Sequence, residues 1–222
     1  MIMSVIYPLL CVIIPCLIYQ IIAVKSEDLK EKAYLIPHLI WVYIFLIYIY
    51  LAFSVAGIGS VWDIGQYGGI IRIEEINLIP FNSEGIRTYI LNIIMFIPLG
   101  FLLPLIWEKF RNFARVFWTG LGFSLAIEIC QLFNHRATDI DDLMMNSLGA
   151  VLGYFIWVCV SNLFNSISEK YAFISKNEDN IKNETTINTN KMTISISKNE
   201  AIIYLTLAIL GEFFLYNWML VS

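Results

Sequence analysis

Long apolar runs, separated by polar connections, dominate the pattern along this chain of 222 residues. Six of these runs are long enough, or nearly long enough, to cross about 30 Å of hydrocarbon as α-helices. Prolines occur inside several runs, and membrane helices tolerate them better than soluble helices do. The pattern predicts an all-α membrane protein with about six transmembrane helices. We expect these helices at residues 2–24, 35–56, 89–107, 115–133, 143–164 and 201–221.

The composition indicates the same class of protein. Hydrophobic residues make up 59% of the chain and charged residues 14%, a balance that ordinary soluble domains do not show. The net charge of −4 offers no basic surface, so we exclude nucleic acid as a partner. The cysteines lie inside apolar runs without a C-x-x-C pair, which is typical of small buried hydrophobic residues and not of metal ligands or disulfides. They are Cys11, Cys16, Cys130 and Cys159.

Lysine and arginine are distributed unevenly between alternate connections. Eleven of them fall in 25–34, 108–115 and 165–200, and only three fall in 57–88 and 134–142. Cytoplasmic loops of membrane proteins carry the excess of basic residues, so the first group of connections is expected in the cytoplasm. The sequence therefore predicts that both termini are extracytoplasmic and that the loops 57–88 and 134–142 face outward.

The runs and their connections divide the chain into four parts. Residues 1–34 hold an N-terminal transmembrane anchor and a short cytoplasmic loop, and residues 35–165 form a central helical membrane domain. Residues 166–200 are polar and predict a disordered cytoplasmic loop, which is followed by a C-terminal transmembrane helix at 201–222. The connection 57–88 combines glycines with aromatic residues, which suits either a segment folded onto the membrane surface or a flexible loop with a few interfacial anchors.

The stretch from 128 to 153 places many polar side chains between two apolar runs. At about 100° per helical residue, Asp139, Asp142 and Asn146 share one face with two glycines. Ionisable groups in membrane helices usually face a bundle interior or a water-filled cavity, so a functional site is expected here. Helix capping, with Thr138 as N-cap, explains only one or two of these residues. The candidate ligand-binding residues are Asn92, Glu128, Gln131, Arg136, Asp139, Asp142 and Asn146.

Four ordered motifs carry a resemblance to a known family. They are N-L-I-P-F at 77–81, N-I-I-M-F-I-P-L-G at 92–100, E-I-C-Q at 128–131 and R-A-T-D-I-D-D-L-M-M-N-S-L-G-A-V-L-G at 136–153. In this order they resemble the VanZ-like family of bacterial integral membrane proteins over roughly residues 35–165. The structural positions that match are Asn77, Pro80, Phe81, Phe96, Pro98, Gly100, Gly149 and Gly153.

The resemblance implies a protein of the bacterial cell membrane and cell envelope. The namesake of the family is associated with low-level resistance to teicoplanin, a lipoglycopeptide antibiotic, and the resemblance raises the same expectation for this chain. It assigns no catalytic or binding role to any residue. The chemistry therefore has to be inferred from the residues themselves.

Two mechanisms from different classes fit these residues. In the first, the candidate residues line an outward-facing polar site that binds a lipid-linked or amphiphilic ligand, with the segment 57–88 as its lid. Arg136 would hold a phosphate or carboxylate, while the amides and acids would accept hydrogen bonds from sugar or peptide groups. The partners expected are membrane lipids, lipid-linked cell-wall precursors and lipoglycopeptides, and the sequence leaves the oligomeric state open.

The alternative is an intramembrane metal-dependent enzyme that modifies a lipid or polyprenyl-phosphate headgroup. Glu128, Asp139 and Asp142 are the candidate ligands for Mg²⁺, a cofactor that only this alternative requires. No nucleophile and base pair is evident, so the sequence assigns no catalytic residue and leaves open whether the protein is an enzyme. A proton-coupled transporter, with Glu128 and Glu212 as titrating groups, is a third possibility.

Overall fold

The structure is a computed structural model that describes residues 3–26, 32–66, 76–81, 85–134, 138–178, 197 and 199–220. Six α-helices run through these residues. They are α1 (Met3–Ser26), α2 (Lys32–Ala56), α3 (Ile86–Ile106), α4 (Phe113–Gln131), α5 (Ile140–Glu178) and α6 (Glu200–Leu215). The short elements are the 3₁₀ turns η1 (Val61–Asp63), η3 (Glu108–Phe110) and η5 (Trp218–Leu220), and the strands β1 (Ile76–Asn77) and β2 (Thr138–Asp139). The all-α class with about six transmembrane helices is confirmed.

The helices fit a protein that crosses a membrane several times. Among the described residues, α1 to α5 each contain an apolar stretch long enough to span a bilayer, whereas α6, with 16 residues, is shorter. Large apolar side chains lie on the outer faces of the bundle, and Ile18, Ile40 and Ile94 are each about half exposed. Apolar surface of this extent is typical of helices that are surrounded by lipid.

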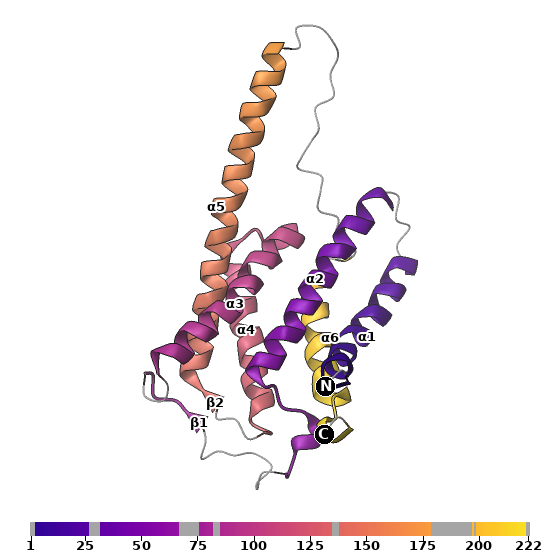
Figure 1. Cartoon of the computed structure of the whole chain (residues 1–222), viewed down its shortest axis with the longest axis vertical. Helices are drawn as coiled ribbons and strands as arrows, with labels where there is room; N and C mark the ends of the chain where they lie inside the picture. Colours follow the sequence, from indigo (N-terminus) through magenta and orange to yellow (C-terminus); the bar gives the residue numbers. More distant parts are fainter. Residues whose placement is uncertain are drawn as a thin grey trace.

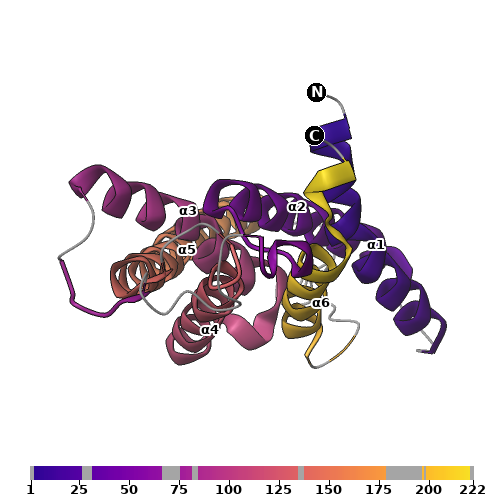
Figure 2. The same ribbon diagram turned by 90° about the horizontal axis from the view of Figure 1, so that it is seen from below.

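The helices form two neighbouring groups (Figure 1, Figure 2). α3, α4 and α5 pack together on one side of α2, and α1 packs against α6 on the other. The start of α1, the end of α6 and both strands lie at one end of the bundle, which we call the strand end, where α2 and α4 finish and α3 and α5 begin. This arrangement agrees with the topology expected from the basic residues, and the assignment of the strand end to the outside stays a prediction.

Glycines allow α3 and α5 to form the most extensive helix contact of the bundle. A Cβ atom added at Gly100 would lie 1.9 Å from the carbonyl oxygen of Ala150, and one added at Gly153 would lie 2.0 Å from that of Ile97. Gly149 also faces α3 without room for a side chain. The two backbones therefore touch along the half of α5 that carries the polar motif.

α5 is longer than expected. We predicted that this helix ends at residue 164 and that residues 166–200 form a disordered loop, but the helix continues to Glu178 and projects beyond the others (Figure 1). Residues 165–178 contain no proline or glycine, so the helix can propagate beyond its apolar part. Residues 179–196 of the expected loop lie outside the described residues.

α6 is shorter than expected. It ends at Leu215, whereas the sequence predicts a helix that continues to residue 221. Tyr7 of α1 binds its last turn. The Tyr7 hydroxyl donates to the carbonyl oxygen of Leu215 at 2.7 Å and accepts the backbone N–H of Asn217 at 3.3 Å. These bonds satisfy groups that a longer helix would have paired internally.

Glu200 fixes the other end of α6 to the central domain. Its carboxylate lies 2.9 Å from Nε2 of His38 in α2 and accepts a hydrogen bond from Nε1 of Trp107 at 3.1 Å. The Glu200 and His38 side chains are almost fully buried, and the Trp107 ring packs edge-on against Phe45 in the apolar core. Because a buried carboxylate is stable only with such partners, these contacts define where α6 docks.

Candidate functional site

The candidate site lies at the strand end, where α4 finishes and α5 begins. The backbone N–H of Asp139 donates to Oε2 of Glu128 at 3.2 Å. Glu128 and Asp139 are only 4% and 6% exposed, and Glu128 lies close enough to Asp139 and Asp142 to experience their negative charges. Three carboxyl groups therefore gather in one largely buried place, where ionised carboxylates need hydrogen-bond donors or cations.

The motif N-L-I-P-F forms a turn that is held against the start of α5. Asn77 ends β1, which pairs in parallel with β2 and brings Asn77 opposite Asp139. The Asn77 side chain accepts the backbone N–H of Ile79 at 3.1 Å. Phe81 adopts a left-handed backbone with φ of 62°, which is strained for a bulky residue. Its N–H donates to Oδ1 of Asp141 at 2.7 Å, so a carboxylate of α5 holds the strained turn.

Asp141 anchors this turn, although it is absent from the candidate residues predicted from the sequence. Its side chain is fully buried and also accepts the hydroxyl of Tyr89 at 2.8 Å. Its backbone N–H donates to Oδ1 of Asp139 at 3.0 Å. On a helical wheel Asp141 lies away from the face that Asp142 shares with the glycines, so periodicity gave no reason to include it. Its partners come from a distant part of the chain.

Two amide side chains link α5 to its neighbours. Asn92 of α3 donates through Nδ2 to Oδ1 of Asp142, and Asn146 donates through Nδ2 to the hydroxyl of Ser124 in α4 at 3.0 Å. Asn146 is 2% exposed, and its Oδ1 has no hydrogen-bond partner among the described residues. A buried acceptor without a donor is costly, so a molecule that offered a donor there would be stabilised.

Gln131 and Asn134 tie the end of α4 to the end of α2. Nε2 of Gln131 donates to the carbonyl oxygen of Ala56, and Nδ2 of Asn134 donates to that of Gly57, both at 2.8 Å. Gly57 has a φ of 64°, a conformation that suits glycine at the end of a helix. Gln131 therefore supports the connection after α2, and its Oε1 is buried without a partner among the described residues.

The remaining motif positions lie in the helix bundle and in the turn at 77–81. Phe96 is fully buried in α3, and its ring centroid lies 5.8 Å from that of Phe123 in α4. Pro98 lies inside α3, and Pro80 lies in the exposed turn before Phe81. These contacts are structural, and they position the polar residues at the strand end.

Most of the predicted site residues come together where α3, α4 and α5 converge. We call this group the polar cluster: Asn92, Glu128, Asp139, Asp142 and Asn146. Arg136 lies outside the described residues. Within the described ranges, no three histidine, cysteine, aspartate or glutamate side chains are arranged to hold a metal ion. The Mg²⁺ site of the enzyme hypothesis stays a prediction.

Apolar helices that cross a membrane several times, with a buried polar cluster at one end, define a multi-pass membrane protein. Residues 40–165 match the VanZ/LLP1 family, and the chain belongs to this family. It is also similar to Protein VanZ of Enterococcus faecium, with 40% identity over 82 residues. The similar stretch is 36% of this chain and 50% of that protein, so the chain spans about half the length of this relative. No solved structure matches the chain.

Proposed function

We propose that the polar cluster is an outward-facing site that binds a lipid-linked or amphiphilic ligand, and that this binding gives low-level resistance to teicoplanin and related lipoglycopeptides. The ligand would supply hydrogen-bond donors to the cluster from a sugar, peptide or amine headgroup. Its apolar part would stay in the lipid. Membrane lipids, lipid-linked cell-wall precursors and lipoglycopeptides all combine these two properties.

The observation that carries the proposal is the concentration of buried hydrogen-bond acceptors. Carboxyl oxygens accept hydrogen bonds, and those of Glu128, Asp139 and Asp142 lie within one cluster. Oδ1 of Asn146, which has no partner within the part of the chain that the structure describes, lies one helical turn beyond Asp142. Sugar hydroxyls and peptide N–H groups are donors of the kind that such a cluster would bind.

The turn formed by residues 77–81 supports an amphiphilic ligand. Leu78, Ile79 and Phe81 are 70%, 63% and 67% exposed, and they lie at the end of helices that cross the membrane. Exposed apolar side chains at this position suit the boundary between lipid and water. In the proposal, release of the hydrogen bond between Phe81 and Asp141 admits the headgroup, which is the lid role of the segment 57–88.

The outward orientation and the resistance rest on separate arguments. The distribution of basic residues favours an outward-facing strand end by the positive-inside rule. The resemblance to VanZ-like proteins implies low-level teicoplanin resistance, and the relative named Protein VanZ is matched over half of its length. A site on the outer side could meet a lipoglycopeptide directly, so the two arguments are compatible with one proposal.

The test compares bacteria that express the wild type, an empty vector, Glu128→Gln or Glu108→Gln. The glutamine of Glu128→Gln would keep an acceptor for the backbone N–H of Asp139 but lose the carboxyl group, and Glu108 is exposed in η3 at the opposite end of the bundle. We expect the wild type and Glu108→Gln to raise the teicoplanin concentration that stops growth, and Glu128→Gln to lose the effect at equal membrane level. Equal protection by Glu128→Gln would contradict the proposal.

The same cells also test the enzyme hypothesis. This hypothesis starts from the proximity of Glu128, Asp139 and Asp142, although no three such side chains among the described residues are arranged to hold a metal ion. A lipid or cell-wall precursor that mass spectrometry finds changed only with the wild type would support catalysis and identify the substrate class. Unchanged profiles together with a wild-type shift in teicoplanin sensitivity would support binding.

A further inference from the structure

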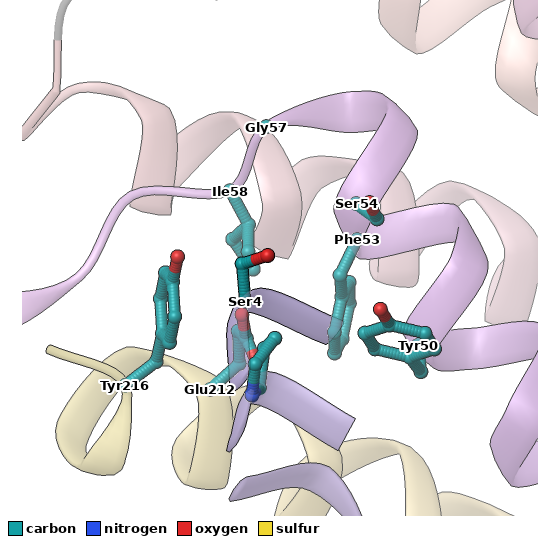
Figure 3. A pocket seen from close by; sticks show the side chains of 9 residues that line it. Ser4, Tyr50, Phe53, Ser54, Gly57, Ile58, Glu212 and Tyr216 are labelled. Carbon is teal, nitrogen blue, oxygen red and sulfur yellow. The ribbon is translucent and has the colours of Figure 1, made fainter. Parts of the chain in front are cut away.

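A pocket lies away from the polar cluster, between α1, α2 and α6 (Figure 3). Its volume is about 170 Å³. All of α1 and α6 fall outside the residues that match the VanZ/LLP1 family, whereas the α2 wall of the pocket, with Tyr50, Phe53 and Ser54, lies within them. The side chains that the argument uses are Ser4, Tyr50, Phe53, Ser54, Glu212 and Tyr216.

Glu212 is the acidic side chain on the α6 wall of this pocket. It is only 5% exposed, and its Oε2 is buried without a hydrogen-bond partner among the described residues. No lysine, arginine or histidine is among the described residues that line the pocket. A carboxylate in a membrane helix is costly and usually marks a functional position, and none of the described lining residues offers Glu212 a positive group.

The other walls suit a positively charged organic group. Tyr50 and Phe53 of α2 and Tyr216 at the end of α6 present aromatic rings, and Figure 3 shows them around Ser4 and Glu212. Ring faces attract ammonium groups, and a carboxylate forms charge-assisted hydrogen bonds with them. An anion would meet no positive side chain among the described lining residues, and a hydrocarbon tail would leave Oε2 of Glu212 without a partner among the described residues.

The position of the pocket suits a headgroup more than a tail. Glu212 lies in the last turn of α6 and Ser54 in the last turn of α2, both at the strand end. Gly211 allows α6 to pack directly against α1, because a Cβ atom there would lie 2.2 Å from the carbonyl oxygen of Cys11. The pocket is therefore placed at the level of a membrane surface, close to Tyr216.

We propose that this pocket binds an organic ammonium group, with Glu212 as its counter-ion. The volume is similar to that of an engineered cavity of about 150 Å³ that holds benzene, so an aminoethyl group fits. The amine comes from a lipid headgroup such as phosphatidylethanolamine or from a small soluble amine. This proposal does not depend on the function of the polar cluster.

The experiment uses the full chain in detergent micelles with phosphatidylethanolamine or phosphatidylglycerol of equal acyl chains, and with ethanolamine in separate samples. Native mass spectrometry measures the retained lipid, and titration with ethanolamine measures binding of the soluble amine. The variants are Glu212→Gln, Ser54→Leu, which fills the pocket but keeps the carboxylate, and Glu108→Gln as the matched loss of one exposed charge. Thermal unfolding checks that each variant is folded.

We expect the wild type and Glu108→Gln to prefer the amine lipid, and Glu212→Gln to bind the amine about tenfold to hundredfold more weakly, as expected for loss of a hydrogen bond to a charged group. Retention of phosphatidylethanolamine that ethanolamine does not displace would identify the lipid as the source, and binding of ethanolamine alone would identify a soluble amine. If Glu212→Gln does not fold, loss of binding in Ser54→Leu supports the proposal. Wild-type binding without preference for the amine, or equal binding by folded Glu212→Gln, would overturn it.

Discussion

Substitution of Gly153 by alanine tests the contact between α3 and α5. The new Cβ atom would lie 2.0 Å from the carbonyl oxygen of Ile97 and 2.9 Å from the backbone nitrogen of Phe101, whereas ordinary contact begins at 3.4 Å. Both obstacles are backbone atoms, so they cannot turn away as a side chain can. The two helices must separate locally by about 1.4 Å at the closest atom.

The cost follows from overpacking. Extra atoms in a well-packed core cost about 1–3 kcal/mol, and alanine recovers up to about 1 kcal/mol because it favours the helix more than glycine does. We expect Gly153→Ala to lower the free energy of unfolding by about 2 kcal/mol. Gly122→Ala in α4 is the matched control, because no described atom outside its own helix lies within 4 Å of the new Cβ atom. That variant should be unchanged or more stable by up to about 1 kcal/mol.

The assay is unfolding of the purified chain in mixed micelles with increasing sodium dodecyl sulfate, followed by tryptophan fluorescence. The difference between the two variants is the decisive quantity, because both make the same chemical change in a membrane helix. Equal stability of Gly153→Ala and Gly122→Ala would refute the close approach of α3 and α5 at this position.

Three further predictions use the same unfolding assay. Asp141→Ala should lower the free energy of unfolding by about 3 kcal/mol, because two hydrogen bonds to a buried carboxylate are lost, and Tyr89→Phe, which removes one of them, should cost less. Glu200→Ala should cost about 3–5 kcal/mol, since its two buried partners lose their acceptor. Gly57→Ala should cost about 1–2 kcal/mol because of its positive φ, whereas Gly85→Ala, in open space with an extended backbone, should be nearly neutral.

The membrane helices could be predicted from the sequence, because a long apolar run has few alternatives in a lipid bilayer. Their ends were less predictable. α6 stops at Leu215, whose carbonyl oxygen accepts a hydrogen bond from Tyr7, more than 200 positions earlier in the chain. α5 continues beyond its apolar part because nothing in residues 165–178 breaks a helix. Apolar content identifies the span but does not set where the helix ends.

The sequence predicts which polar residues form the candidate site, but it does not predict which residues they contact. Helical periodicity shows which residues share a face, and it correctly grouped Asp142 with Gly149 and Gly153. It does not show which helix meets that face, so the contact with Asn92 in α3 required the structure. The anchoring role of Asp141 depends on a turn about 60 residues earlier, beyond the reach of any local pattern.

The central claim is that the polar cluster binds a ligand, and Asn146→Leu tests it most directly. Leucine has a similar size and removes the buried Oδ1 that lacks a partner among the described residues, while the Ser124 hydroxyl can turn to the carbonyl oxygen of Gly120 in its own helix. The variant should therefore unfold at the same or a higher denaturant concentration than the wild type. Substitution of a residue with only a structural role would instead lower the denaturant concentration at which the protein unfolds.

The measurement is equilibrium binding of fluorescent teicoplanin and of a polyprenyl-linked cell-wall precursor to the full chain in lipid nanodiscs. We predict saturable binding of at least one probe by the wild type, weakened about tenfold to hundredfold in a stable Asn146→Leu variant. Failure of both probes to bind the wild type, or equal binding by the variant, would contradict the account.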